Sequence, residues 1–376
     1  MRIVYVLTSL GVGGAERQAL AVADRMVQRG HEVAVLVLSP RLAEEWPTRL
    51  RVVHMNIRKT ALSGLSGFLS ARSFLREFRP DLLHSHSFHA NLVARLLNLI
   101  VPSLKVICTI HNVYEGGWRR MMTYRLTDDL SCLTTAVSQA AAVRFVELKA
   151  VHRGKCLVVR NGIDIDEFMP SADRRCITRG AMGAGSSFIW LAAGRLVAAK
   201  DYPNVLRAFR KVRAEFPEAQ LWIAGASADG IPKRTEGGGV GLASRLAVEY
   251  DWMEQVRLLG LRRDMPALFD AADGFVLSSA WEGMPLVVGE AMAMEKPVVA
   301  TDVGGTRELI GDAGTMVRPA DSDALAAAMI EVIRQPVQTR QSLGQVARAR
   351  IAREFSMDAR ADEWEAVYRN VVEAAP

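Results

Sequence analysis

Residues 2–38, RIVYVLTSLGVGGAERQALAVADRMVQRGHEVAVLVL, contain the pattern that decides the fold. A continuous apolar run over Arg2–Thr8 predicts a buried strand that ends in a glycine-rich loop. Apolar residues at helical spacing over Ala15–Arg29, closed by Gly30, predict a helix. Alternating valines predict a second strand over His31–Leu38. A strand, a helix and a strand in this order are typical of a parallel, doubly wound sheet, so we expect an α/β fold.

The same rhythm continues in two series. We expect the first series to add strands over Asp81–His86, Lys105–Ile110, Leu133–Ser138 and Leu157–Asn161. We expect a second sheet with strands over Phe188–Ala193, Gln220–Ala224, Val256–Leu259, Gly274–Ser278, Pro297–Thr301 and Thr315–Val317. Because 376 residues exceed the usual size of one domain, we predict two Rossmann-like domains, 1–170 and 188–355. Residues 171–187, rich in glycine and small residues, are expected to form the linker.

The last segment, 356–376, reads as a helix from Ser356 to Glu373. One face of this helix carries an apolar stripe of Trp364, Val367, Tyr368 and Val371. The second domain does not need this stripe to complete its own core. In open α/β sheets ligands bind at the carboxyl ends of the strands. Two facing domains would therefore place a reaction in the cleft between them.

Composition and charge exclude several classes of protein. Half of the residues are apolar and 23% are charged, as in ordinary globular chains. The four cysteines show no Cys-x-x-Cys pair, so we expect reduced core thiols in a cytoplasmic protein rather than a zinc site or a disulfide scaffold. The net charge is +6, with the basic excess in residues 1–170. A nucleic-acid module is not visible, which leaves anionic lipid or a phosphorylated substrate as partners of the basic face.

The most informative stretch for function is Ser279–Asp302, SAWEGMPLVVGEAMAMEKPVVATD. Pro285 occupies what we read as a first helical position, so the N–H groups of Leu286 and Val287 are free to bind an anion. Glu282 in the preceding loop and Glu290 two turns up the helix could then accept hydrogen bonds from hydroxyl groups on either side. Two carboxylates beside an anion site suit a nucleotide sugar. Two solvated helix glutamates would be the structural alternative.

Two cations strengthen the functional interpretation. Arg195 and Lys200 follow the first strand of the second domain and would neutralise a diphosphate leaving group. In the first domain, Gly13 and Gly14 permit close backbone approach to a ligand, and we expect that ligand to be the donor phosphates. The glycine loop lacks the third glycine of a dinucleotide fingerprint and no acidic residue closes the second strand, which argues against NAD.

Histidines and acidic pairs offer further candidate sites. His84, His86 and His89 cluster near one strand end, where packing against a cleft is favoured over metal binding. His111, which ends the next strand, is the better functional candidate. The acidic pairs Asp164/Asp166 and Asp128/Asp129 could hold a divalent cation under a diphosphate, but Arg195 and Lys200 would make that ion redundant. We therefore expect no metal and no cofactor.

The chain resembles a family 4 retaining glycosyltransferase of the GT-B fold over nearly its full length. The matching motifs are GVGGAE at 11–16, TIHN at 109–112, RNGID at 160–164, GRLVAAKDYPN at 194–204, the block 258–293 that contains SAWEGMPLVVGEAMA, and ATDVGGTRELI at 300–310. The sequence departs from the family pattern at Asp201, where glycine is common, and at Met284, where phenylalanine is common. These departures concern fine preference for the donor.

The resemblance implies a role for each matching residue. Arg195 and Lys200 would hold the diphosphate, Glu290 the ribose, and Glu282 with the adjacent backbone the sugar hydroxyls. The donor-binding residues would also include Gly283, Met284, Leu286 and Val287. It also implies that His111 lies near the transferred sugar, that Gly13 and Gly14 approach the phosphates, and that the last helix crosses back to the first domain. Such enzymes are thought to retain the anomeric configuration by front-face attack, which agrees with the absence of a visible nucleophile set.

We therefore expect a retaining, metal-independent hexosyltransferase that uses a nucleoside diphosphate sugar, with UDP favoured, and a glycan or lipid-linked acceptor in polysaccharide, lipopolysaccharide or glycolipid assembly. The alternatives are an epimerase or phosphorylase on the same fold, or a non-catalytic subunit that binds sugar nucleotides. Basic and bulky apolar residues alternate over Arg58–Arg79 and Trp118–Arg125. These segments favour peripheral binding at the inner face of an anionic cell membrane over simple packing helices.

Overall fold

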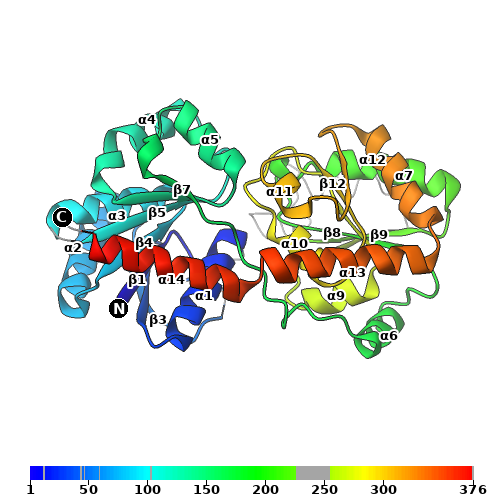
Figure 1. Cartoon of the computed structure of the whole chain (residues 1–376), viewed down its shortest axis with the longest axis horizontal. Coiled ribbons are helices and arrows are strands. Elements are labelled where there is room, and N and C mark those ends of the chain that lie inside the picture. Colours follow the sequence, from blue (N-terminus) through cyan, green and yellow to red (C-terminus); the bar gives the residue numbers. More distant parts are fainter. Residues whose placement is uncertain are drawn as a thin grey trace, which may run out of the picture. The chain divides into compact units, whose positions relative to one another are not determined.

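The computed structural model describes residues 1–11, 13–42, 45, 47–58, 60–101, 104–225 and 255–374. Val12 of the glycine loop and Lys59 of the first basic segment lie outside the described residues. The chain divides into two compact units, one of Met1–Gly162 with Met357–Pro376 and one of Ile163–Ser356. Each unit holds a parallel sheet covered by helices on both faces (Figure 1).

Unit 1 contains a seven-stranded sheet in the order β3-β2-β1-β4-β5-β6-β7, with every described pair parallel. Its strands are β1 (Arg2–Leu7), β2 (Glu32–Val37), β3 (Arg51–His54), β4 (Leu82–His86), β5 (Lys105–Ile110), β6 (Leu133–Ala136) and β7 (Cys156–Val158). The edge strand β3 was not predicted, because it is only partly buried and lacks a continuous apolar run. The α/β fold class that we predicted is confirmed.

Helices cover both faces of this sheet. They are α1 (Gly14–Gln28), α2 (Ala61–Phe78), α3 (Phe88–Ile100), α4 (Trp118–Thr127), α5 (Gln139–Glu147) and α14 (Met357–Glu373), with short 3-10 helices at Asp128–Leu130 and Arg153–Lys155. One face packs apolar side chains of α2 and α3 against the central strands. The other face is covered by α1 and α14, which contact each other.

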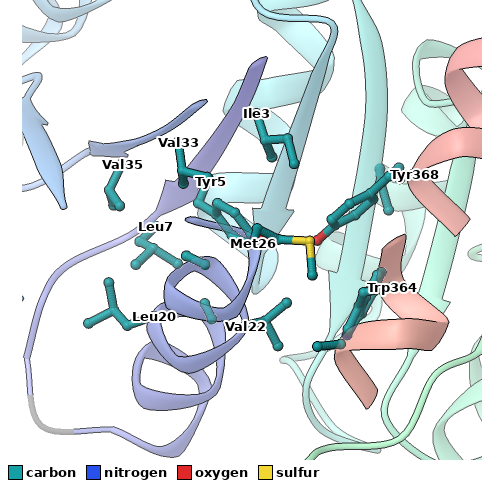
Figure 2. Close-up of a cluster of buried hydrophobic side chains, with 14 of the residues drawn as sticks. Ile3, Tyr5, Leu7, Leu20, Val22, Met26, Val33, Val35, Trp364 and Tyr368 are labelled. Carbon is teal, nitrogen blue, oxygen red and sulfur yellow. The ribbon is translucent and has the colours of Figure 1, made fainter. Parts of the chain in front are cut away.

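Helix α14 supplies much of the core beneath α1. Trp364 and Tyr368 project from α14 into a cluster with Tyr5 of β1 and Met26 of α1 (Figure 2). All four side chains are at most 3% exposed. The stripe that stood out on the last helix is therefore buried in the first unit, although it follows 194 residues of unit 2 in the chain.

Unit 2 contains a six-stranded parallel sheet in the order β10-β9-β8-β11-β12-β13. Its strands are β8 (Ile189–Ala193), β9 (Gln220–Ala224), β10 (Val256–Gly260), β11 (Gly274–Leu277), β12 (Val298–Thr301) and β13 (Thr315–Val317). Its helices are α6 (Ala172–Ala181), α7 (Tyr202–Glu215), α9 (Met265–Ala271), α10 (Leu286–Ala293), α11 (Thr306–Ile310), α12 (Ser322–Arg334) and α13 (Val337–Glu354), with a 3-10 turn at Ala198–Lys200. The order of both sheets places the crossover beside the first strand of each unit, where doubly wound folds bind ligands.

The segment 171–187 differs from the linker that we expected. It contains α6, which belongs to unit 2 and is capped by the hydroxyl of Ser171. Arg175 and Arg179 bind Asp273 at N–O distances of 2.6 and 3.1 Å, which ties α6 to the start of β11. Helix α6 has no buried side chain. The sequence therefore shows no apolar stripe there, since arginine–carboxylate pairs replace apolar packing.

The unit boundary also lies earlier than 170. Ile163 starts unit 2, its N–H donates to the carbonyl of Phe355 at 2.8 Å, and it pairs with Ser356 as an isolated bridge. The cysteines are free, but only Cys108 is buried, whereas Cys132 and Cys176 are exposed. The expectation of four core thiols was wrong, because α6 and the turn before β6 leave these two side chains on the surface. Across the described residues, no helix is long and apolar enough to cross a membrane.

Candidate functional site

In unit 2, the polar residues that the sequence singled out lie where β8 and β11 end. The Nζ of Lys200 lies 2.6 Å from Oε1 of Glu282, and the Ser279 hydroxyl donates to the same oxygen at 2.7 Å. Glu282 is 8% exposed. The structure therefore brings together the lysine and the loop glutamate, which are 82 residues apart in the chain. A nearly buried carboxylate that is paired in this way is held in one orientation.

Backbone contacts fix the loop that carries Lys200. The Ser278 hydroxyl donates to the carbonyl of Lys200 at 2.8 Å, and the N–H of Ala280 donates to the carbonyl of Ala199 at 2.8 Å. The Tyr202 hydroxyl donates to the carbonyl of Gly194 at 2.8 Å. These bonds join the end of β8 to the loop after β11, so the two segments form one rigid surface. Sequence reasoning missed Ser279 and Tyr202, although Ser279 begins the stretch that was quoted.

The conformation of Asp201 explains its position in the motif. Its φ is 42° and its ψ is 52°, which is the left-handed region where glycine is preferred and aspartate is tolerated. Asp201 thus adopts a backbone conformation that glycine adopts without strain.

A glycine pair supports the Glu282 loop from behind. Gly304 has a φ of +55°, and a Cβ at this position would lie 2.0 Å from the carbonyl oxygen of Glu282. The N–H of Gly305 donates to the carbonyl of Gly283 at 2.7 Å. The glycines of the 300–310 motif therefore allow the backbone after β12 to lie directly against the loop that positions Glu282.

Helix α10 begins beside this loop. Pro285 is its N-cap rather than its first residue, so the prediction was displaced by one position and Leu286 and Val287 are the first two helical residues. Their N–H groups lie in the first turn, where helices leave donors for an anion. Met284 is buried, and Glu290, also on α10, is 6% exposed. Arg195, at the end of β8, is exposed to solvent.

The glycine loop of unit 1 begins α1. Gly13 is the N-cap, Gly14 is the first helical residue, and the N–H of Arg17 donates to the carbonyl of Gly13 at 3.1 Å. The carboxylate of Glu16 lies close over Gly13, 2.2 Å from where a Cβ would be. Gly13 therefore leaves room for the carboxylate of Glu16 at the helix N-terminus, where a negative charge is stabilised. In the described structure this carboxylate occupies the space over Gly13 that the sequence suggested for a ligand.

Three histidines of unit 1 lie next to one another, with His84 and His86 buried and His111 partly buried. His84 has both ring nitrogens bonded, Nδ1 to the Tyr368 hydroxyl and Nε2 to the Thr109 hydroxyl, each at 2.7 Å. The Nδ1 of His86 lies 2.9 Å from Nε2 of His111. His89 is exposed at the start of α3 and does not lie with the other three histidines, so the predicted cluster of His84, His86 and His89 was wrong for His89. Tyr368 could not be found from sequence, because it lies 284 residues from His84.

Burial keeps these histidines neutral. It lowers the pKa of His111 from 6.5 to about 4, and it lowers the pKa of His84 and His86 well below the ordinary value. The backbone N–H of His111 donates to the carboxylate of Glu115 at 3.0 Å, and the Tyr124 hydroxyl donates to its other oxygen at 2.6 Å. At neutral pH the rings of His84, His86 and His111 are therefore hydrogen-bonding groups without charge.

The acidic candidates for metal binding have structural partners. Asp164 caps a turn by accepting from the N–H groups of Asp166 and Glu167, at 3.1 and 3.0 Å. Asp128 pairs with the buried Arg95 at 3.2 Å, and Asp129 pairs with Lys155 at 3.1 Å. Across the described ranges, no three His, Cys, Asp or Glu side chains are grouped so as to hold a metal ion.

Comparisons with known proteins identify the family. Residues 12–167 match the family model described as Glycosyltransferase Family 4, and residues 187–335 match the model described as Glycosyl transferases group 1. The chain belongs to glycosyltransferase family 4. The resemblance seen in the sequence is thus confirmed, and the glycosyltransferase has the two parallel-sheet units of a GT-B enzyme.

Relatives and solved structures of this glycosyltransferase point in the same direction. It is 23% identical, over 83% of this chain and 81% of the relative, to the UDP-Gal:alpha-D-GlcNAc-diphosphoundecaprenol alpha-1,3-galactosyltransferase of Escherichia coli. It is 26% identical, over 96% of this chain and 86% of the relative, to the D-inositol 3-phosphate glycosyltransferase of Mycolicibacterium paratuberculosis. The fold is similar to that of Anabaena HepE in complex with UDP and glucose, with a TM-score of 0.83, 20% identity and coverage of 98% of this chain and 99% of that one.

Proposed function

We propose that this glycosyltransferase moves a hexose from a nucleoside diphosphate sugar, with UDP as the nucleotide, to a glycan or lipid-linked acceptor, with retention of configuration and without a metal ion. The observation that carries the proposal is the Lys200–Glu282 pair, 2.6 Å apart at the carboxyl edge of the unit 2 sheet. A cation and a carboxylate held side by side suit a ligand that presents phosphate next to hydroxyl groups.

Each residue has a chemical task in this proposal. Lys200 and Arg195 bind oxygens of the diphosphate and stabilise the charge that develops as it leaves. The first N–H groups of α10, from Leu286 and Val287, bind the same phosphates. Glu282 accepts hydrogen bonds from the sugar, and Glu290 accepts them from the ribose diol. In unit 1, Gly13 and Gly14 leave space for the phosphates, and His111 binds a hydroxyl of the transferred sugar.

The leaving diphosphate takes the proton of the acceptor hydroxyl on the same face of the sugar. The protein then contributes positioning and electrostatic stabilisation, not a covalent intermediate. The name of the Escherichia coli relative supports a UDP-sugar donor and a diphosphate-lipid acceptor, and the HepE complexes support UDP. A Corynebacterium glutamicum relative, 28% identical over 68% of this chain and 67% of its own, is named as GDP-mannose-dependent. The nucleotide therefore needs a direct test.

The first experiment measures thermal unfolding with UDP, GDP and ADP at equal concentrations. A ligand that binds only the folded state raises Tm by mass action, so UDP should give the largest shift. The matching donor sugar is then incubated with and without candidate acceptors, and the anomeric signals are followed by NMR. Transfer with retained configuration supports the proposal. Conversion of the donor without acceptor indicates an epimerase, release of a sugar phosphate indicates a phosphorylase, and binding without turnover indicates a non-catalytic subunit.

The surface of unit 1 supports a membrane-bound acceptor. Leu62, Leu65 and Leu69 of α2 are 83, 62 and 56% exposed, on the face opposite the residues that α2 buries against the sheet. Arg72 and Arg76 lie on the same exposed face by helical spacing. Helix α2 is thus apolar on both faces. An apolar row flanked by cations fits the boundary between headgroups and acyl chains of an anionic bilayer.

Helix α4 presents a second row of the same kind. Trp118, Met122 and Leu126, spaced four residues apart, are 72, 40 and 77% exposed. Helix α3 contacts both α2 and α4, so the two rows belong to one series of neighbouring helices (Figure 1). Arg119 is exposed beside Trp118, but Arg120 donates to the carbonyl of Glu115 at 2.7 Å and lies over the Phe88 ring. Arg120 is therefore part of the local packing, and Arg119 and Arg125 are the better cations to test.

We expect salt-sensitive cosedimentation with anionic vesicles, each bound cation contributing about 1 kcal/mol. The double variant Arg119→Glu with Arg125→Glu, and separately Leu62→Ser with Leu65→Ser, should reduce binding about 10-fold or more. Ile177→Ser, which removes a side chain 71% exposed on α6 of unit 2, is the matched control and should leave binding unchanged. No binding of the native protein at low ionic strength would indicate a soluble acceptor.

A further inference from the structure

The contact between His86 and His111 joins two neutral imidazoles in unit 1. Their Nδ1 and Nε2 atoms are 2.9 Å apart, and burial depresses the pKa of both rings. A neutral imidazole has one N–H donor and one lone-pair acceptor. One ring must therefore donate and the other accept, and the choice determines what the second nitrogen of His111 can do.

The second ring nitrogen of His86, Nε2, indicates which of the two rings donates the hydrogen bond. This nitrogen is buried and has no hydrogen-bond partner within the described part of the chain. If the proton were on Nε2, this N–H would be a buried donor without an acceptor, which costs the full desolvation penalty of the group. If the proton is on Nδ1, the N–H is satisfied by His111, and only a lone pair faces the buried side.

We propose that His86 donates from Nδ1 to Nε2 of His111 and thereby holds the His111 proton on Nδ1. His86 is then a positioning residue, because it acts only through His111. This inference rests on the proposed function, which places His111 beside the transferred sugar. It assigns His111 as a hydrogen-bond donor to a hydroxyl oxygen. Since the lone pair of its other nitrogen is occupied, His111 cannot act as the general base for the acceptor.

The surrounding residues hold His86 in this orientation. Its ring stacks on Tyr5 with a centroid separation of 5.9 Å and an interplanar angle of 10°, and it lies 4.1 Å from the His84 ring. His84 is itself bonded at both nitrogens, to Tyr368 of α14 and Thr109 of β5. Through Tyr368, His84 and His86, the C-terminal helix α14 therefore helps to hold the ring of His111 in place.

The charged groups near His111 come from the loop after β5 and from α4. The Glu115 carboxylate binds the backbone N–H of His111 and the Tyr124 hydroxyl, and burial raises the pKa of this carboxyl. The Arg120 guanidinium binds the backbone carbonyl of Glu115. Among the described residues, these groups engage the backbone around His111, whereas His86 contacts the His111 ring itself.

The direct test is the tautomer of His111 in the native full-length protein at pH 7. With ¹⁵N in the rings of the seven histidines, two-bond N–H correlation spectra distinguish protonated from unprotonated ring nitrogens. His111→Asn and His86→Asn identify the two spin systems by the loss of their signals. We expect protonated Nδ1 in both rings. A His111 ring with its proton on Nε2 would overturn the proposal.

A kinetic test uses paired variants. His86→Asn keeps an N–H donor near the Nδ1 position and should retain kcat within about 3-fold, whereas His86→Leu removes the donor and should lower kcat about 10-fold or more with a smaller change in donor KM. Equal kcat for these two folded variants would overturn the positioning role. His111→Asn should likewise retain more activity than His111→Leu. Native activity in both His111 variants, with the expected tautomer in the spectra, would place the failure in the proposed role of His111 at the sugar.

Discussion

The two units differ in the chemistry that they place at the ends of their strands. Unit 2 presents charges, with the Lys200–Glu282 pair at the edge of its sheet and Arg195 exposed beside it. Unit 1 presents the imidazoles of His84, His86 and His111, which burial keeps neutral. Charge suits a diphosphate and a neutral hydrogen-bonding surface suits a polyol. The comparison therefore agrees with the proposal that the diphosphate binds at unit 2 and that His111 of unit 1 binds a hydroxyl of the sugar.

The largest expected effect tests the charged edge of unit 2. We expect Lys200→Ala and Glu290→Ala each to lower kcat/KM by about 10²-fold or more, because each removes a strong contact to the leaving nucleotide. The fold should survive in both variants. Lys211→Ala is the matched control, since this lysine of α7 forms an ion pair with Asp323 on the surface and should be nearly neutral. Near-native turnover in both site variants would show that these residues of unit 2 are not part of the donor site.

The second prediction concerns the glycine that supports Glu282. In Gly304→Ala the new Cβ would meet the carbonyl oxygen of Glu282 at 2.0 Å, so backbone must shift. We expect a loss of about 3 kcal/mol in the free energy of unfolding and a raised donor KM. Gly183→Ala is the control, because its φ is +57° and nothing lies within 4 Å, and it should lose about 1 kcal/mol. Urea unfolding measures the loss of stability in each variant. Equal losses would contradict the close approach of Gly304 to the carbonyl of Glu282.

The third prediction concerns the neutral edge of unit 1. Because burial lowers the pKa of His111 from 6.5 to about 4, the unfolded chain takes up a proton between these values while the folded chain does not. Stability should therefore be complete above pH 6.5 and fall as the pH drops toward 4, by up to about 1.4 kcal/mol per pH unit for each buried histidine. Urea unfolding at pH 7 and pH 5 measures the slope. The variant His84→Phe should show a shallower slope, and an unchanged slope would argue that His84 is not buried in the neutral form.

The smallest expected effect is that of a chelator. In the proposed mechanism Arg195 and Lys200 supply the positive charge that a divalent cation would otherwise bring, so EDTA should leave transfer within about 2-fold of its native rate. The assay is run with and without EDTA, followed by addition of Mg²⁺ or Mn²⁺. Loss of activity that either metal restores would show that the cations of unit 2 are not sufficient.

Much of the fold could be predicted because buried parallel strands read as short apolar runs. The strand from Gln220 to Ala224 was predicted to the residue, since all five of its side chains are buried. The edge strand Arg51–His54 was missed because none of its side chains is fully buried. Helix α6 was missed because arginine–carboxylate pairs hold it in place of an apolar face.

The candidate site, like the fold, could be predicted from the sequence only in part. Lys200, Glu282 and Glu290 stood out from motif and spacing, and the structure brings the first two into contact. Their roles in catalysis stay predictions. The hydrogen-bond partners of the histidines could not be predicted, because Tyr368 reaches His84 from the far end of the chain.

The sequence by itself determined the two parallel sheets, the family and the charged motif of unit 2, because each depends on residues close together in the chain and on periodic burial. Only the tertiary structure decided which groups meet across elements: Tyr368 with His84, His86 with His111, and Gly304 with Glu282. Packing α14 against β1 and α1 places the tyrosine there, and the length and spacing of a segment carry no record of that contact. The tautomer of a buried histidine follows from such contacts, so it belongs to the folded molecule alone.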